Sequence, residues 1–101
     1  MNEISPINFF KHYQTKNNFK IIDIREFNEY EKYHIKNTIN VPFELLMNKH
    51  YLFINKNTRY YIICDNGDKS KTATDYLETL GYDVVYIIGG IKNWPGSFEK
   101  K

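Results

Sequence analysis

The segment Tyr60-Tyr61-Ile62-Ile63-Cys64-Asp65-Asn66-Gly67-Asp68-Lys69-Ser70 carries the clearest structural signal of the chain, because an apolar run gives way in it to a polar loop that contains a glycine. The β-branched and aromatic residues of 60–63 predict a strand, and the helical pattern from Ser70 onward predicts a helix after the loop. Backbone N–H groups and a helix N-terminus then converge on one point and favour an anion there. Cys64, the only cysteine of the chain, stands at this point. It is either a small buried core residue or a nucleophile whose thiolate depends on stabilisation at this position.

The rest of the chain alternates between predicted helices and strands. Ser5-Pro6 is typical of a helix start, and that helix is expected to break at residues 16–18. Further strands are predicted at 19–24, 38–41 and 82–88, and further helices at 26–33, 43–53 and from 70 to the C′ glycine Gly81. The alternation predicts an α/β layer structure with a mainly parallel sheet, in which 60–63 is the central strand.

Amphipathic spacing predicts which helical side chains face the core. In the helix at 26–33 we expect Phe27 and Tyr30 to point inward. In the helix that starts at Ser70, the apolar stripe consists of Ala73, Tyr76, Leu77 and Leu80.

Three loops lie at the carboxyl edge of the predicted sheet, where ligands bind in folds of this class. The loop after Ile24 offers Arg25, the loop at Cys64 offers the thiol, and the loop after Ile88 offers the pair Gly89-Gly90, which permits close backbone approach. The sequence therefore predicts a site at this edge.

Length and composition indicate the number of domains, the kinds of partner and the cellular compartment to expect. With 101 residues we expect one domain over 1–101, and a net charge of +2 spread along the chain does not favour nucleic-acid binding. One cysteine forms no internal disulfide, no apolar run is long enough to cross a membrane, and the start Met1-Asn2-Glu3-Ile4-Ser5-Pro6 does not resemble a signal peptide. We therefore expect a cytoplasmic protein, and the oligomeric state stays open.

Four segments carry a family resemblance, and together they span nearly the whole chain. They are Ile21-Ile22-Asp23-Ile24-Arg25-Glu26 with Glu29-Tyr30, the segment from His34 to Pro42, the loop from Cys64 to Ser70, and Gly89-Gly90-Ile91-Lys92-Asn93-Trp94. In this order and spacing, the chain resembles the rhodanese homology domain of the single-domain sulfurtransferase type. The resemblance implies a central, mainly parallel sheet of about five strands flanked by helices on both faces.

The resemblance also implies a reaction. The Cys64 thiolate takes a sulfane sulfur from a donor, holds it as a persulfide and passes it to an acceptor thiol or to cyanide, without a metal or an organic cofactor. The residues implied to bind the substrate are those of the loop, Asp65, Asn66, Gly67, Asp68, Lys69 and Ser70. Inward-pointing N–H groups at a helix N-terminus would stabilise the negative charge in every step.

The loop departs from the family pattern in its charge. Many active members place arginine directly after the cysteine, where this chain has Asp65, and Asp68 adds a second carboxylate. Only Lys69, with Lys71 just beyond it, offers positive charge. Because carboxylates disfavour a neighbouring thiolate and repel a dianion, we expect poor turnover of thiosulfate. A low-molecular-weight persulfide or a protein donor fits better.

Two other functions remain as alternatives. A thiol phosphatase or arsenate reductase needs an arginine fork where this chain has Ser70, and Lys69 cannot make the bidentate contact. A non-catalytic partner-binding or sulfur-relay module would use the acidic loop as a recognition surface.

Two charged residues near the predicted site have structural explanations. We expect Arg25 to pair with Asp23 or Glu29, and His34 to be a hydrogen-bonding core or turn residue with no role as a base. The spacing of the histidines around the single cysteine predicts no metal site.

Overall fold

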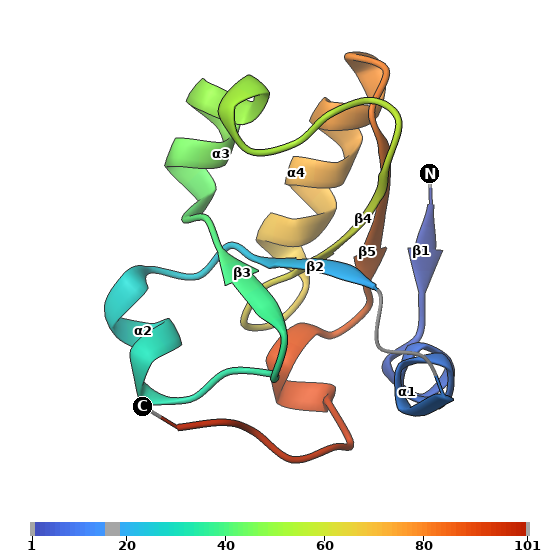
Figure 1. Ribbon diagram of the computed structural model, residues 1–101, viewed down its shortest axis with the longest axis vertical. Helices are drawn as coiled ribbons and strands as arrows, with labels where there is room; N and C mark the ends of the chain where they lie inside the picture. Colours follow the sequence, from blue (N-terminus) through green and yellow to red (C-terminus); the bar gives the residue numbers. More distant parts are fainter. Residues whose placement is uncertain (1, 16–18, 101) are drawn as a thin grey trace.

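Five parallel strands form one sheet in the order β1-β5-β4-β2-β3, with β4 at the centre as predicted (Figure 1). The strands are β1 Glu3–Ile4, β2 Lys20–Asp23, β3 Thr38–Asn40, β4 Arg59–Ile63 and β5 Asp83–Ile87. The computed structural model describes residues 2–15 and 19–100, so the predicted break at 16–18 lies outside the described residues. Because all pairings are parallel, the loops that follow the strands meet at one edge.

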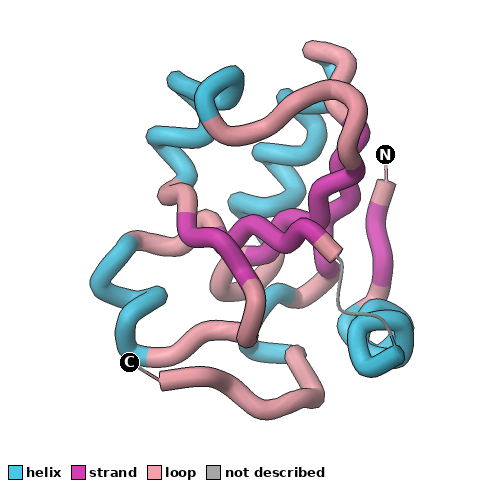
Figure 2. The backbone as a smooth tube through the Cα atoms, in the orientation of Figure 1, coloured by secondary structure: helices cyan, strands magenta, loops and turns pink. Residues whose placement is uncertain are grey.

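Helices cover both faces of the sheet, as the family resemblance implied. They are α1 Pro6–Thr15, α2 Phe27–Lys32, α3 Phe43–Lys49 and α4 Asp68–Thr79, with the 3-10 turns η1 His50–Leu52 and η2 Gly90–Asn93. Helices α3 and α4 lie on one side of the sheet, and α1, α2 and η2 lie on the other (Figures 1 and 2). The Ser5 hydroxyl caps α1 by accepting a hydrogen bond from the Asn8 N–H at 3.1 Å.

The strand side chains alternate between two apolar clusters, one on each face. Ile22 and Ile62 pack with Leu77 under α3 and α4, while Ile21 and Ile63 pack with Phe9 under α1 and η2. Both faces of the central strands are therefore buried, which explains why these strands are continuous apolar runs in the sequence. Trp94 closes the second cluster against Phe9, Phe10 and Tyr13.

For two of the side chains, the prediction that they face the core is wrong. Phe27 is 60% exposed because it lies in the first turn of α2, a six-residue helix without a fully buried side chain. Tyr76 is 43% exposed, because α4 begins at Asp68 and turns Ala73, Thr74 and Leu77 toward the sheet. The spacing of these three buried residues fits one helical face, and the hydroxyl of Thr74 hid that face in the sequence pattern.

Two element boundaries also differ from the sequence pattern. Strand β1 was not predicted, because two residues at an edge give no recognisable period; its pairing with β5 places Glu3 opposite Tyr86. The helix predicted at 43–53 is divided into α3 and the turn η1 at His50.

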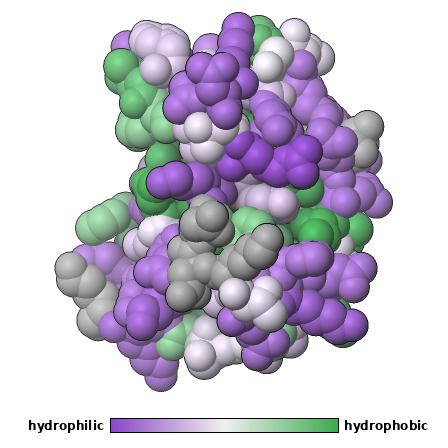
Figure 3. All heavy atoms as spheres, turned by 45° about the vertical axis from the view of Figure 1, so that its right-hand side comes forward, coloured by the Kyte–Doolittle hydropathy of each residue, from purple (hydrophilic) through white to green (hydrophobic). Residues whose placement is uncertain are grey.

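The surface carries its charges and apolar groups in a mixed pattern. On the face shown in Figure 3, hydrophilic residues dominate, and the hydrophobic areas are small and separate. Among the described residues, no helix combines the length and the apolar character needed to cross a membrane.

Candidate active site

Cys64 lies directly after β4, at the carboxyl edge of the sheet, and is 4% exposed. The Cys64 carbonyl accepts a hydrogen bond from the Ile91 N–H at 2.8 Å, and the Asp65 carbonyl accepts one from the Lys92 N–H at 3.1 Å. The first turn of η2 thus holds the backbone on which the thiol stands. The predicted meeting of the two loops at this edge is confirmed.

Two backbone amides point at the sulfur. The N–H groups of Gly67 and Ser70 donate to Cys64 Sγ at 3.1 and 3.3 Å. Gly67 has a left-handed backbone with φ 98°, which turns its amide toward the sulfur at the start of α4. An anion at Sγ would therefore be stabilised by two donors and by the positive end of α4.

The Ser70 hydroxyl completes the surroundings of the sulfur. The Cys64 S–H donates to Ser70 Oγ at 3.4 Å, and the Ser70 O–H donates to the Gly67 carbonyl at 3.1 Å. Ser70 is fully buried, so its hydroxyl is held in this arrangement by packing. When the thiol loses its proton, the same hydroxyl is within reach to turn and donate to the sulfur.

The glycine pair allows the two loops to approach closely. A Cβ at Gly90 would lie 2.3 Å from the Cys64 carbonyl oxygen, and a Cβ at Gly67 would lie 2.9 Å from the Gly89 nitrogen. No side chain larger than hydrogen fits at these contacts without moving the backbone. The close approach predicted for Gly89-Gly90 is therefore confirmed.

A cavity of about 320 Å³ opens above the thiol. Its wall includes the predicted loop residues Asp65, Asn66, Asp68 and Lys69 together with Cys64. The other two predicted residues, Gly67 and Ser70, are buried beneath the cavity and contact the sulfur directly. The arrangement places the six predicted loop residues around the Cys64 thiol and its cavity, while their role in substrate binding stays a prediction.

Three further residues of the cavity wall were missed in the sequence. Ile24, Glu26 and Glu29 come from the end of β2 and the start of α2. Their place after the strand that pairs with β4 was a usable signal, because the carboxyl ends of neighbouring parallel strands share an edge.

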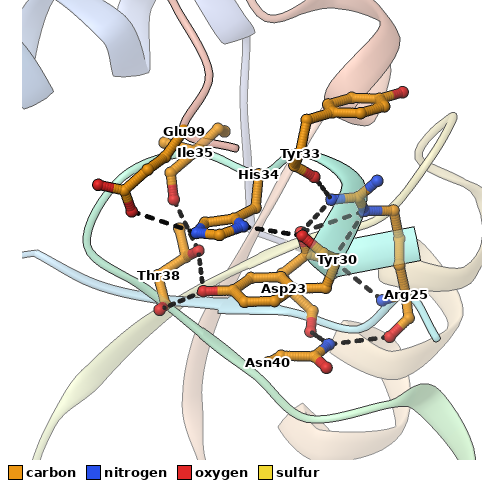
Figure 4. A network of polar contacts seen from close by, with 9 residues as sticks. All are labelled: Asp23, Arg25, Tyr30, Tyr33, His34, Ile35, Thr38, Asn40 and Glu99. Atoms are coloured by element: carbon orange, nitrogen blue, oxygen red, sulfur yellow. Dashed lines mark hydrogen bonds and ion pairs between the residues drawn. The ribbon is translucent and has the colours of Figure 1, made fainter. Parts of the chain in front are cut away.

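Arg25 also lines the cavity, but its guanidinium is committed elsewhere (Figure 4). Its Nε and Nη2 donate to the Asp23 carboxylate at 3.0 to 3.1 Å, and Nη2 donates to the Tyr33 carbonyl at 2.6 Å. The Arg25 side chain is only 2% exposed. The predicted pairing with Asp23 is confirmed, and Glu29 instead pairs with Lys32 at 3.5 Å.

His34 connects α2 to the C-terminal segment, as Figure 4 shows, and is absent from the cavity wall. Its ring stacks on Tyr30 with centroids 3.9 Å apart, and its nitrogens lie 2.8 Å from the Tyr30 carbonyl and 3.2 Å from Glu99 Oε1. The predicted hydrogen-bonding role is confirmed. In the following turn Asn37 has φ 67°, the left-handed conformation that favours glycine.

The donors around the cavity suit a small anion at the sulfur better than a phosphate dianion. The loop from Cys64 to Ser70 contains no arginine, and Nε and Nη2 of Arg25 are occupied by the Asp23 carboxylate and the Tyr33 carbonyl, which leaves only the single nitrogen Nη1 without a partner among the described residues. A phosphate in the cavity would therefore meet no free fork of N–H donors, which a thiol phosphatase uses to hold its substrate. Within residues 2–15 and 19–100, no group of three or more potential ligand side chains is placed to hold a metal ion.

Comparisons with known proteins agree with the geometry. The adenylyltransferase and sulfurtransferase uba4 of Ogataea parapolymorpha is 35% identical over 80 residues, 78% of this chain and 21% of that protein. YrkF of Bacillus subtilis, named as a candidate sulfur carrier protein, is 32% identical over 98 residues, 96% of this chain and 52% of that protein. The chain thus spans about a fifth and about half of these two curated relatives.

Solved structures and a family model give the same assignment. The crystal structure of a rhodanese-like domain protein from Staphylococcus aureus matches with a TM-score of 0.90 and 28% identity, covering 100% of this chain and 99% of that chain. The model of the rhodanese-like domain matches residues 8–97. The chain therefore belongs to the rhodanese-like domain family.

Proposed function

We propose that this protein transfers sulfane sulfur through a persulfide on Cys64. The observation that carries the proposal is the pair of N–H groups, from Gly67 and Ser70, that donate to Cys64 Sγ. Donors aimed at this sulfur stabilise the thiolate that attacks in the first step and the thiolate that leaves in the second; in the persulfide between them the negative charge lies on the outer sulfur. The names of the relatives, which include sulfurtransferase and sulfur carrier, support the same chemistry.

The reaction has two balanced steps. In the first, the Cys64 thiolate attacks the sulfane sulfur of the donor; a new S–S bond forms, and the donor leaves with the electron pair of the old bond. In the second, an acceptor thiolate or cyanide attacks the terminal sulfur of the persulfide and restores the Cys64 thiolate. No external oxidant or reductant takes part in either step.

We further propose that the donor is a thiol persulfide or a donor protein in preference to thiosulfate. Asp65 and Asp68 face the cavity, and the nearest guanidinium, on Arg25, is neutralised by Asp23. A thiosulfate dianion would therefore enter against uncompensated negative charge. The acceptor would be a thiol or cyanide.

The test is to incubate the protein with a thiol persulfide or with thiosulfate and to measure its intact mass. We expect one added sulfur atom with the persulfide, less with thiosulfate, and none in Cys64→Ser. Ser70→Ala keeps the thiol and its two amide donors, so it should still gain the sulfur. The proposal is wrong if the wild-type protein gains no sulfur from either donor.

A sulfur relay to a partner protein is the alternative supported by the longer relatives, because the chain covers only part of each. A relay predicts that the Cys64 persulfide forms in stoichiometric amount but is released slowly to small thiols or cyanide. An independent sulfurtransferase predicts many turnovers with the same acceptors. Counting the sulfur atoms transferred per protein molecule separates the two roles.

A further inference from the structure

The wall of the Cys64 cavity carries an excess of negative charge. Its lining includes the carboxylates of Glu26, Glu29, Asp65 and Asp68 and only two cationic side chains, Arg25 and Lys69. The carboxylates come from two separate segments, residues 26–29 at the start of α2 and residues 65–68 that lead into α4. Negative charge therefore faces the thiol from two sides of the opening.

Both cationic side chains of the wall contact groups that do not line the cavity, although among the described residues Arg25 keeps one buried nitrogen, Nη1, without a hydrogen-bond partner. The guanidinium of Arg25 is held in a buried pair with Asp23, so the pair adds no net charge. The ammonium of Lys69 lies over the ring of Phe43, 5.4 Å from its centroid, and Phe43 does not line the cavity. A cation–π contact does not neutralise the ammonium, so Lys69 offsets one of the negative charges of the wall.

Most of the carboxylates have no partner of opposite charge. Glu29 pairs with Lys32 at 3.5 Å, and both side chains of this pair are well exposed. Within residues 2–15 and 19–100, Glu26, Asp65 and Asp68 form no ion pair. Three carboxylates without an ion-pair partner, against one such ammonium, thus leave the wall with a net negative charge. They border a partly enclosed space, where charges interact more strongly than in open water and the field is focused on what enters.

From this distribution we propose that the cavity selects low-molecular-weight sulfur compounds that carry a positive charge next to the reacting sulfur, the aminothiol class, over anionic ones. The inference rests on the proposed function and names the substrate class of the same site. A volume of about 320 Å³ is sufficient for a small aminoalkyl thiol or persulfide. The ammonium would lie among Glu26, Asp65 and Asp68 while the sulfur meets Cys64.

The transfer step leaves the selecting charge unchanged. The Cys64 thiolate attacks the sulfane sulfur of an aminoalkyl persulfide, the S–S bond of the donor breaks, and the aminoalkyl thiolate leaves with the electron pair. The ammonium keeps its proton and its charge in donor and product. The carboxylates therefore attract the donor and offset part of the repulsion between the two sulfur anions.

The experiment compares three methanethiosulfonate reagents that differ only in charge: the 2-aminoethyl cation, the neutral methyl reagent and the 2-sulfonatoethyl anion. The Cys64 thiolate attacks each reagent, forms a mixed disulfide and releases methanesulfinate. The rate of reaction with the cation divided by the rate with the anion therefore reports the electrostatic field at the sulfur. The reference is the same ratio for the protein unfolded in urea. At low ionic strength we expect the ratio for the native protein to exceed the ratio for the unfolded protein at least about fivefold, which corresponds to about 1 kcal/mol. This difference should become smaller as salt is added, because salt screens the charges of the wall.

Variants that remove one carboxylate charge test whether the cavity wall causes the higher ratio of the native protein. Asp65→Asn and Asp68→Asn should each lower the native ratio. Glu78→Gln removes the same charge at the other end of α4, about 15 Å along the helix from Asp68, and should leave the ratio unchanged. A native ratio no larger than the unfolded ratio overturns the inference, as does an equal drop in Glu78→Gln. Failure of the protein to gain sulfur in the mass measurement instead overturns the proposed function, so the two failures are distinguished.

Discussion

Replacing Gly67 by alanine tests whether the loop amides control the reactivity of the sulfur. Gly67 has φ 98°, and its new Cβ would lie 2.9 Å from the Gly89 nitrogen. The left-handed backbone alone costs a residue with a side chain about 1–2 kcal/mol, and the collision forces the loop to move away from η2. The Gly67 N–H then loses its position 3.1 Å from Cys64 Sγ. A hydrogen bond to a charged acceptor contributes about 1.5–3 kcal/mol, so alkylation of Cys64 should slow by about ten- to a hundredfold.

Gly81→Ala is the matched control, because Gly81 has a similar φ of 96° but lies at the end of α4, away from the cavity. Its Cβ would meet only the Lys56 side chain, at 3.7 Å, so the variant carries the backbone strain without the collision. Urea unfolding should show a loss of about 1–2 kcal/mol for Gly81→Ala and a larger loss for Gly67→Ala. Iodoacetamide should alkylate Cys64 in Gly81→Ala at the wild-type rate. If folded Gly67→Ala reacted within twofold of the wild-type rate, the amide cradle would not control the thiol.

Three further predictions concern stability. Arg25→Met leaves the buried Asp23 carboxylate unpaired and should lower the free energy of unfolding in urea by about 3–5 kcal/mol; a loss below about 1 kcal/mol would contradict the role of this pair. Burial raises the pKa of Tyr86 above its usual 10.0. The stability linked to its proton is therefore complete below pH 10 and is lost as the pH rises further. The free energy of unfolding, measured across this range, should fall less steeply with pH in Tyr86→Phe than in the wild-type protein. Phe27→Ser, on the exposed side of α2, should change stability by about 0.5 kcal/mol or less, whereas Leu77→Ala in the core should cost about 2–5 kcal/mol, and equal losses would contradict the burial of the two side chains.

The order of elements and the edge that carries the site were predictable from the sequence. The run from Tyr60 to Ile63, the turn residues after Cys64 and the helical period from Ser70 are local signals, because strand, turn and helix each impose their own spacing on neighbouring residues. Parallel pairing then brings the ends of the strands together, so Cys64 and Gly89-Gly90 were expected at one edge. The four motifs carried the family assignment, which the match over residues 8–97 confirms.

Other features depended on contacts between segments that are distant in the chain. Strand β1 has only two residues and is defined by its pairing with β5, more than 80 positions later. The exposure of Phe27 follows from the position of a six-residue helix at the edge of the domain and not from its apolar character. Local periodicity does not contain this information, because it reports which residues share a face and not what that face packs against.

The charge of the site shows most clearly the difference between what neighbouring residues reveal and what depends on contacts between distant segments. The order of the residues alone shows that two carboxylates, Asp65 and Asp68, follow Cys64, and it predicts that they lie in a segment that leads into a helix. Contacts in the folded chain establish that Glu26 joins them from another segment, that Asp23 and not Glu29 pairs with Arg25, and that Lys69 lies over Phe43. Because electrostatic interaction depends on distance and burial in space, the field at Cys64 is set by which loops meet at the sheet edge.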